Sequence, residues 1–381
     1  MKFKIMALLC GLLFMMPSCS NKPTTKDAEG TNIIRANRNA ESNLLPDLFG
    51  EVQLIPLETT DNSLMADIHF SKVKNDTLFL FSRKQYALFM FNTKGEYLNK
   101  ISKVGQGPGE YTLIHDFDIC PKRNSIEMLS PFGSIYSYTM NGDFIEKRLL
   151  ADGVYSYQDF EYLNGDSMVV WTVVETGTDA LRIIDSESAE IITSYKKAHR
   201  CLDRFKTFHK VNGIVYFSNK FDHYTYRVTS NGLVPEYIWD FGDDTYFIEQ
   251  KDYTGLPDDA QAEQKEMEAS LIDGTIPYVL TERGETSDYY YLCIFEKRKI
   301  LKHFFVHKTS RKSYNFVSDD DHIHLDPIHI GDNYILSEIK YEDILRYLDS
   351  GLLSDKDKEI LRKITTDDNP VIAKLFFKES N

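Results

Sequence analysis

LFMFNTKGEYLNKISKVGQGPGEY, residues 88–111, carries the clearest structural pattern in this chain. The stretch opens with alternating side chains, turns through NTKG at 92–95 and ends in a glycine-rich loop at 105–111. Period-two alternation around a short turn that ends in glycine predicts a β-hairpin. Similar hairpins follow at 135–145, 184–191 and 226–234. Because a hairpin repeated at roughly 40–50 residues is typical of propellers built from four-stranded blades, the sequence predicts an all-β propeller.

The strand candidates divide into six groups, of which the last is incomplete. Five groups each fit one blade: 68–102, 113–149, 155–195, 204–240 and 276–317. The C-terminal group, 323–377, lacks one strand, whereas residues 52–57 form a strand candidate that belongs to no blade. Pairing of the N-terminal with the C-terminal strand would close the ring and cover both edges, so we predict a six-bladed β-propeller.

Small helical insertions are expected within this propeller domain, which we place at residues 46–381. The first should cover 257–272, with Pro257 in its first turn and Gly274 after its end. Two shorter helices are expected around 341–348 and 355–363. Few positions of the first helix are apolar, so it should lie on the surface and add nothing to the core.

Composition and charge exclude some classes of protein. The 23 Tyr and 24 Phe against 12 Pro in 381 residues indicate a globular, strand-rich chain rather than a disordered one. The formal net charge is −14. An acidic surface argues against non-specific binding of nucleic acid, so no nucleic-acid partner is expected.

The first 18 residues have the features of an export signal peptide. Lys2 and Lys4 precede an apolar run at 5–16 that is too short to span a bilayer. MPSC at 16–19 resembles the bacterial lipobox, in which the cysteine, here Cys19, receives a lipid group. Residues 19–45 are then expected to form a flexible tether. A lipid anchor with a tether would hold the protein at a membrane, and simple secretion is the alternative.

Three cysteines remain beyond the signal peptide: Cys120, Cys201 and Cys293. An odd number at wide spacing, without a Cys-x-x-Cys motif, indicates neither a disulfide framework nor a zinc site. Each cysteine is expected to occupy a strand position as a small buried hydrophobe, although oxidation of one pair in an export compartment stays open.

The loop GQGPGEY at 105–111, the segment FNTKGEY at 91–97 and IPLET at 55–59 together resemble the six-bladed β-propeller lipoproteins of Bacteroidetes, which are similar in architecture to NHL-repeat proteins. The resemblance covers nearly the whole mature chain and implies the fold and an envelope location. In this phylum an acidic run after the lipidated cysteine is associated with surface display. SNKP at 20–23 lacks such a run, which favours an outer-membrane anchor that faces the periplasm.

The glycine-rich loop is the first candidate binding site. It should join the outer strand of the first blade to the inner strand of the second and border the mouth of the channel. Its glycines permit positive φ angles and expose N–H groups that could contact an anion or a sugar. The candidate binding residues are Gly105, Gln106, Gly107, Gly109, Glu110, Tyr111, His115 and Asp116. The alternative is a tight turn between blades, in which the glycines serve packing alone.

The second candidate site is DDDHIHLDPIH at 319–329, the densest group of His and Asp in the chain. If a strand covers 323–330, His322 and His324 share one face, and Asp320 or Asp326 could join them. Oxygen and imidazole ligands suit Ca²⁺, Mn²⁺ or Zn²⁺, so a divalent cation in the central channel is an open hypothesis. The alternative is a solvated acidic loop followed by ordinary strand histidines.

No nucleophile motif such as Gly-x-Ser-x-Gly is present, and no cysteine has a cue for activation. The leading hypothesis is therefore an envelope-anchored scaffold that recognises a protein partner or a glycan without catalysis. The rival hypothesis is a hydrolase or lyase that uses a channel metal, as six-bladed lactonases do. A sensor or assembly module of a nutrient-uptake system at the outer membrane is implied by the resemblance alone.

Overall fold

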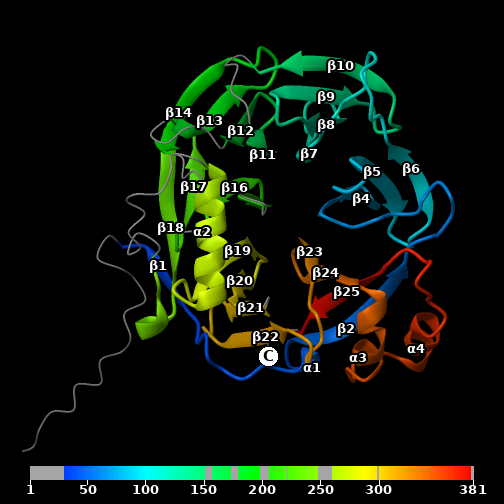
Figure 1. Ribbon diagram of the computed structural model, residues 1–381, viewed down its shortest axis with the longest axis vertical. Coiled ribbons are helices and arrows are strands. Elements are labelled where there is room, and N and C mark those ends of the chain that lie inside the picture. The colour runs from blue at the N-terminus through cyan, green and yellow to red at the C-terminus, as the bar shows by residue number, and fades with distance from the viewer. Residues whose placement is uncertain are drawn as a thin grey trace, which may run out of the picture.

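The computed structural model describes residues 30–150, 157–172, 179–197, 206–220, 222–247, 260–297 and 300–378. Its strands form six sheets arranged around a central axis, as the ribbon diagram shows (Figure 1). In each sheet, neighbouring strands of the blade pair in antiparallel fashion. The architecture is a six-bladed β-propeller, which confirms the prediction from the repeated hairpin.

Each blade is written here from its innermost strand outward. Blades one and two contain β3 (Phe70–Lys74), β4 (Thr77–Ser82), β5 (Ala87–Asn92) and β6 (Tyr97–Ile101), then β7 (Asp116–Cys120), β8 (Ser125–Leu129), β9 (Ser134–Tyr138) and β10 (Phe144–Leu149). Blades three and four contain β11 (Tyr157–Tyr162), β12 (Ser167–Thr172), β13 (Asp179–Asp185) and β14 (Ile191–Lys197), then β15 (Phe208–Val211), β16 (Ile214–Ser218), β17 (Tyr224–Thr229) and β18 (Gly232–Asp240). Blade five contains β19 (Tyr278–Glu285), β20 (Tyr289–Glu296), β21 (Ile300–His307) and β22 (Ser313–Ser318). Blade six contains β23 (Pro327–Ile330), β24 (Tyr334–Ile339), β25 (Val371–Phe377) and β2 (Phe49–Pro56).

Apolar side chains fill the spaces between neighbouring blades. One cluster, for example, joins Phe79 and Met90 of blade one to Phe117 and Met128 of blade two, and all four are almost fully buried. Burying a side chain of this size contributes about 1.5–3 kcal/mol. The middle strands of a blade are covered on both faces, which explains why β5 has a continuous apolar sequence and not a strict alternation.

The ring is closed by the pairing that the sequence predicts. Strand β2 from the N-terminal region lies antiparallel to β25 near the C-terminus, with Leu54 opposite Ala373 and Ile55 opposite Ile372. The buried side chain of Asn369 accepts a hydrogen bond from the backbone of Met65 at 2.8 Å and donates to Glu58 O at 2.8 Å. Blade six is therefore built from both ends of the domain and leaves neither terminal strand unpaired.

The tether predicted at residues 19–45 is wrong for its second half. Residues 32–35 form β1 (Asn32–Arg35), which pairs in parallel with the outer strand β18. The chain then passes the outside of blade five, where Asn43 N donates to Asn315 O at 2.7 Å, and reaches α1 (Leu45–Leu48) beside β2. This segment, residues 31–48, is called the belt below. Polar composition indicated a tether because β1 is short and its partner lies some 200 residues away in sequence.

The short helices near blade six lie at the rim of the ring, whereas the longest helix overlies blades four and five in the view of Figure 1. Helix α2 (Ala260–Asp273) falls within the predicted segment, and the described part of the chain also contains η1 (Gly242–Asp244), η4 (Tyr341–Asp343), α3 (Ile344–Leu348) and α4 (Asp355–Leu361). The expected surface position of α2 is confirmed in part, because Ile272 is exposed whereas Leu271 packs against Ile276 and Val279. None of the described helices is long and apolar enough to cross a membrane.

Two of the three predicted strand cysteines can be placed. Cys120 ends β7 and Cys293 lies in β20, and both are buried free thiols. Burial raises the pKa of the Cys293 thiol well above its ordinary value, so this thiol stays protonated. Cys201, like the predicted lipidation site Cys19, lies outside the described residues.

Candidate ligand-binding cavity

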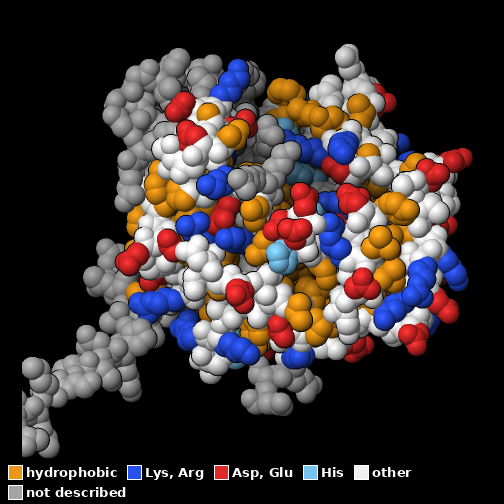
Figure 2. All heavy atoms as spheres, turned by 60° about the horizontal axis from the view of Figure 1, so that its bottom comes forward, with side chains coloured by type: hydrophobic (Ala, Val, Ile, Leu, Met, Phe, Trp, Pro, Cys, Tyr) orange, Lys and Arg blue, Asp and Glu red, His pale blue; other side chains and the backbone are white. Residues whose placement is uncertain are grey.

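A cavity of about 380 Å³ lies at the centre of the ring and is lined by the innermost strands of all six blades. Ligand pockets in proteins commonly have volumes of about 300–1,000 Å³, so the cavity can hold a small molecule. Its wall carries several charged side chains, three aromatic rings (Phe70, Phe208 and Tyr291) and three histidines (His69, His209 and His329). Acidic and basic side chains are also interspersed over the outer face shown in Figure 2.

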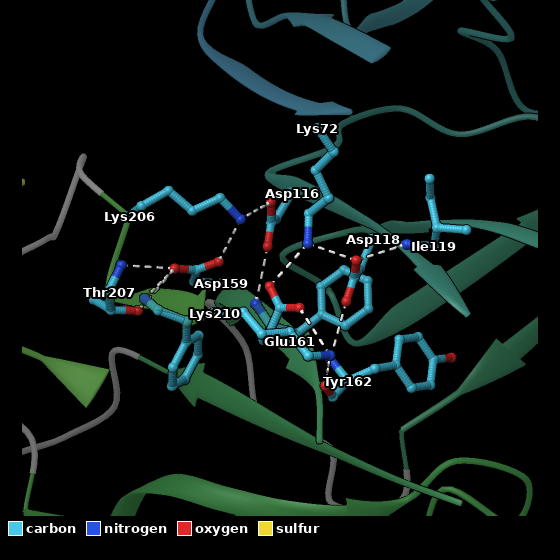
Figure 3. Close-up of polar contacts among 12 residues, drawn as sticks. Lys72, Asp116, Asp118, Ile119, Asp159, Glu161, Tyr162, Lys206, Thr207 and Lys210 are labelled. Carbon is cyan, nitrogen blue, oxygen red and sulfur yellow. Dashed lines mark hydrogen bonds and ion pairs between the residues drawn. The ribbon is translucent and has the colours of Figure 1, made fainter. Parts of the chain in front are cut away.

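Lys72 on β3 connects two carboxylates on the wall of the cavity (Figure 3). Its Nζ lies 2.5 Å from Asp118 Oδ1 and 2.8 Å from Glu161 Oε2. The remaining oxygen of Asp118 accepts a hydrogen bond from the backbone N–H of Tyr162 at 2.9 Å. Lys210 Nζ stands 3.6 Å from the other oxygen of Glu161. The first four inner strands are thereby linked by charged contacts across three blade boundaries.

Lys206, just before β15, makes a second bridge of the same kind (Figure 3). Its Nζ lies 2.6 Å from Asp116 Oδ1 and 3.0 Å from Asp159 Oδ1. Asp159 also accepts hydrogen bonds from the backbone and hydroxyl of Thr207, at 2.7 and 2.9 Å. The two lysines therefore hold four buried carboxylates in fixed positions.

Burial and shared charge move the pKa values of these acids in opposite directions. Burial alone would raise the pKa of Asp159, but Lys206 and several hydrogen bonds lower it to about 2. The pKa of Asp116 is raised well above its ordinary value by burial and by the nearby charge of Asp159. In the other bridge, the pKa of Asp118 is lowered and that of Glu161 is raised. Two carboxylates that share one ammonium cannot both be equally well neutralised.

Blades five and six carry fewer paired charges on their inner strands. Glu285 on β19 lies 2.7 Å from Lys308 Nζ and 3.7 Å from His209 Nε2. Burial lowers the pKa of His329 on β23 to about 4, so this imidazole is neutral at neutral pH. Glu282, also on β19, lines the cavity without a hydrogen bond or an ion pair among the described residues.

The glycine-rich loop lies away from the central cavity. Five of its predicted residues, Gly105, Gln106, Gly107, Gly109 and Glu110, line a separate pocket of about 650 Å³ with side chains of blade two. Within the described chain, none of the loop residues belongs to the wall of the central cavity, so the expected position at the channel mouth is wrong.

The side chain of Glu110 fills the inside of the glycine-rich loop. Glu110 Oε2 accepts a hydrogen bond from Gly107 N at 2.8 Å, and a Cβ on Gly105 would meet that carboxylate at 2.0 Å. The Glu110 carboxylate thus takes the place that a bound anion would need. Tyr111 is buried and donates from its hydroxyl to Tyr86 O at 2.7 Å. These contacts support a packing role for the loop, although its outer surface still borders the pocket.

The last two predicted residues of this group, His115 and Asp116, separate from the loop. His115 Nδ1 lies 2.9 Å from Tyr157 O of blade three. Asp116 opens β7 and belongs to the Lys206 bridge. Phe117 packs in the core, whereas its neighbours Asp116 and Asp118 face the lysines, as side chains that alternate along a strand do.

The predicted metal ligands do not converge on one point. Strand β23 begins only at Pro327, so residues 322–326 form a loop and strand alternation does not apply to them. His322 Nδ1 contacts Asp319 Oδ1 at 2.7 Å, and His324 Nε2 contacts Asp319 O at 2.8 Å. Asp326 pairs with Lys340 at 2.7 Å, and Asp320 accepts from Arg346 through its backbone oxygen at 2.6 Å.

Across the described residues, no group of three or more His, Cys, Asp or Glu side chains is placed to hold a metal ion. The divalent cation therefore stays a prediction, to be tested by the metal content of the protein.

The analysis of the sequence missed Asp159, which pairs with Lys206, and five residues of the cavity wall: Lys72, Glu161, Lys206, Lys210 and Glu282. A usable signal was present. Charged residues stand at alternate positions of the first strand of a blade, as in FSKVK at 70–74 and YQDFEY at 157–162. In a propeller, the first strand of each blade lines the channel, so charges there face one another and not solvent.

The fold and this cavity define the class of protein, a six-bladed β-propeller with a small polar cavity on its axis. A family model described as Domain of unknown function (DUF4934) matches residues 30–375, and the chain belongs to that family. No curated protein matches the sequence at a significant level.

Two solved structures from Bacteroides have a similar fold. One is a Bacteroides fragilis NCTC 9343 protein, provisionally named an exported protein, with a TM-score of 0.74 at 20% identity over 91% of this chain and 100% of that one. The other is a member of the duf4221 family from Bacteroides vulgatus ATCC 8482, with a TM-score of 0.54 at 9% identity over 87% of this chain and 97% of that one. The propeller fold expected from the resemblance is thereby confirmed.

Proposed function

We propose that the protein is a binding scaffold of the bacterial cell envelope that takes a small, hydroxyl-rich ligand, such as a segment of a glycan, into its central cavity. The observation that carries the proposal is the wall of that cavity, where charged groups from different blades are held in place by one another. Fixed donors and acceptors of this kind can recognise hydroxyl groups without rearrangement on binding.

The cavity also has the mixed character that sugars require. Lys72 and Lys210 present N–H donors, Glu161 presents acceptor oxygens, and the rings of Phe70 and Phe208 lie on the same wall. Hydroxyl groups of a sugar pair with such polar groups, while its C–H faces pack on apolar rings. A cavity of about 380 Å³ is too small for a folded protein segment of any size, which favours a glycan over a protein partner.

The paired carboxylates favour binding over catalysis. Hydrolysis of a glycosidic bond commonly needs two carboxyl groups that face the same bond, one as an acid and one as a base or nucleophile. Asp118, Glu161 and Glu285 instead lie within 2.5–2.8 Å of a lysine ammonium. These groups serve best as anchored hydrogen-bond acceptors.

The envelope location rests on separate support. A similar structure has been provisionally named an exported protein, and the first 18 residues of this chain have the features of an export signal. Attachment through a lipid on Cys19, facing the periplasm, is the finer proposal. Labelling of cells with an alkyne analogue of palmitate should tag the wild-type protein and not the Cys19→Ala variant. Equal labelling of both would contradict lipidation.

A glycan array probed with the mature chain, residues 20–381, tests the function. We expect binding that is weakened at least tenfold by Lys210→Met in the cavity. The matched control is Lys147→Met, which removes a lysine from the separate pocket beside the glycine-rich loop and should leave binding unchanged. Equal loss in both variants would contradict binding in the cavity, and turnover of a sugar lactone by the purified domain would contradict a non-catalytic role.

A further inference from the structure

A β-bulge on the inner strand of blade five directs Glu282 to the cavity. In the β19–β20 pair, Leu280 lies opposite Ile294 and Arg283 opposite Leu292, so that two residues of β19 face Cys293 alone. One of the two, Thr281, turns to the sheet and donates from Oγ1 to Cys293 O at 3.0 Å. The other is Glu282, which lines the cavity. Bulges of this kind re-aim a side chain and are frequent beside binding sites.

Glu282 differs from the other acids of the cavity. Each of Asp118, Glu161 and Glu285 contacts a lysine ammonium, whereas Glu282 has neither a hydrogen bond nor an ion pair within the described part of the chain. Burial, reinforced by the carboxylate of Asp326, raises its pKa to about 8. Glu282 is half-buried in the wall of the cavity, and a carboxyl group that is shielded from water without a partner is unfavourable in a folded protein.

The other groups near Glu282 cannot neutralise it. Asp326 is itself an acid and is already paired with Lys340 at 2.7 Å. Tyr291 and Cys293, which also interact with the Glu282 charge, are buried and have raised pKa values, so they remain protonated and uncharged. Among the described residues, no cation forms an ion pair with Glu282, and the neighbouring Arg283 donates instead to the backbone oxygens of Tyr224 and Asn219 at 2.7 and 3.1 Å.

We propose that Glu282 receives a primary ammonium group of the ligand, so that the scaffold selects amino sugars over neutral sugars. This inference rests on the proposed function, because it names the class of glycan that the same cavity takes. An ammonium group has three N–H donors and a full positive charge, which suit a carboxylate screened from water. The proton on the Glu282 carboxyl group leaves to solvent when the cation binds.

The rest of the cavity is consistent with one orientation of such a ligand. The lysines of blades one and four also line the cavity, and each is already engaged with carboxylates. The ammonium end of the ligand would lie at blade five, and its hydroxyl groups would face the ordered pairs of Lys72 and Lys210. The orientation follows from charge alone.

Two disaccharides provide a matched pair of probes. The β-1,4-linked disaccharide of glucosamine and cellobiose have the same rings and linkage, and differ in carrying an ammonium or a hydroxyl at the second carbon of each ring. Calorimetric titration of the mature chain should show at least tenfold tighter binding of the amino disaccharide, the range expected for a hydrogen-bonded charge. Glu282→Gln should abolish that preference and leave the affinity for cellobiose within about twofold. Glu282→Asp should keep part of the preference.

Glu110→Gln is the control variant, since Glu110 is an acid outside the cavity and should leave both affinities unchanged. If the two sugars bind equally well, and Glu282→Gln changes neither affinity, the inference about the ammonium group is wrong and the proposed function stands. If neither sugar binds the wild-type chain, both proposals are wrong for this class of ligand. Far-ultraviolet circular dichroism of each variant separates loss of binding from loss of folding.

Discussion

The inner strands of blades one to four differ from those of blades five and six in how their charged side chains are paired. In the first group, Lys72 and Lys206 each bridge two buried carboxylates, at distances of 2.5–3.0 Å. In the second group, Glu285 is paired, whereas Glu282 faces the same cavity without a hydrogen bond or ion pair to any of the described residues. Both groups come from equivalent positions of one repeated architecture, so their difference does not arise from the fold.

The comparison distinguishes the paired acids and lysines, which stabilise the shape of the cavity, from Glu282, which is available to a ligand. A buried ion pair adds little net stability compared with an apolar pair, but removal of one member is costly because a charge is left behind. Substitution of a bridging lysine in blades one to four, here called the bridged half of the cavity, should therefore lower the stability of the protein strongly. In blades five and six, the unpaired half, the Glu282 side chain opposes folding, so its replacement should be tolerated or should even stabilise the protein.

The largest effect is expected from Lys72→Met, which breaks the bridged half. The substitution leaves Asp118 and Glu161 buried close together without their shared ammonium. The free energy of unfolding should fall by about 3–5 kcal/mol, as for other broken buried pairs. Denaturation by urea at pH 7 would measure the change.

Lys74→Met is the matched control on the same strand. Lys74 contacts the side chain of Asn124 at 2.9 Å and no acid among the described residues, so its loss should cost less than about 1 kcal/mol. An equal loss of stability in the two variants would show that any substitution on this strand is destabilising, and would contradict a specific role of the lysine bridge.

The second effect has the opposite sign. Because the pKa of Glu282 is raised from 4.5 to about 8, the folded protein holds a proton that the unfolded chain releases between these pH values. Stability should therefore fall as the pH rises from 4.5 to 8. Glu282→Gln removes this dependence and should raise the free energy of unfolding by roughly 1–3 kcal/mol at pH 8 and little at pH 4.

Urea denaturation of the wild type and Glu282→Gln at both pH values measures the second effect. A variant that is less stable than the wild type at pH 8 would show that Glu282 has a stabilising partner. The two halves of the cavity would then be alike.

A smaller effect is expected at the glycine-rich loop. Glu110→Ala removes the carboxylate that accepts from Gly107 N, and the free energy of unfolding should fall by about 1 kcal/mol. Binding of sugars in the central cavity should be unchanged, since the loop lines another pocket. A loss of sugar binding on the glycan array would assign the binding site to the loop. The comparison of blades one to four with blades five and six would then say nothing about ligand binding.

The smallest effect is expected from His324→Ala. This imidazole contacts a backbone oxygen and lies outside the wall of the central cavity, so both sugar binding and metal content should remain as in the wild type. Elemental analysis of the purified proteins, before and after dialysis against a chelator, measures the metal. One ion per chain in the wild type that is lost in the variant would support the rival reading of a channel-metal enzyme.

The sequence was sufficient for the fold because a propeller repeats its own signal. The turn that ends at Gly95 returns at Gly142, and both glycines have positive φ angles, of 88° and 84°. Closure by β2 and β25 could also be predicted, since a blade without a strand and a strand without a blade were both visible. Strand β1 could not, because a parallel partner distant in sequence leaves no local pattern.

The cavity was harder to predict than the fold. Asp116 was a candidate from the sequence, but its partner Lys206 lies on another blade, and such a pairing depends on how the ring closes. The histidines at 322–324 stood out by density, yet they precede the strand instead of joining it. Local composition thus pointed to a loop, while the cavity is lined by residues from the inner strands of six separate blades.

The belt also determines how the molecule bears load. A pull applied through residue 30 first meets four parallel backbone pairs between β1 and β18, then the contact of Arg38 with Glu296 at 2.8 Å. Only after these yield does tension reach β2, the strand that closes the ring. For a domain held at its N-terminal end, we therefore expect the belt to detach before the ring-closing pair of β2 and β25 separates.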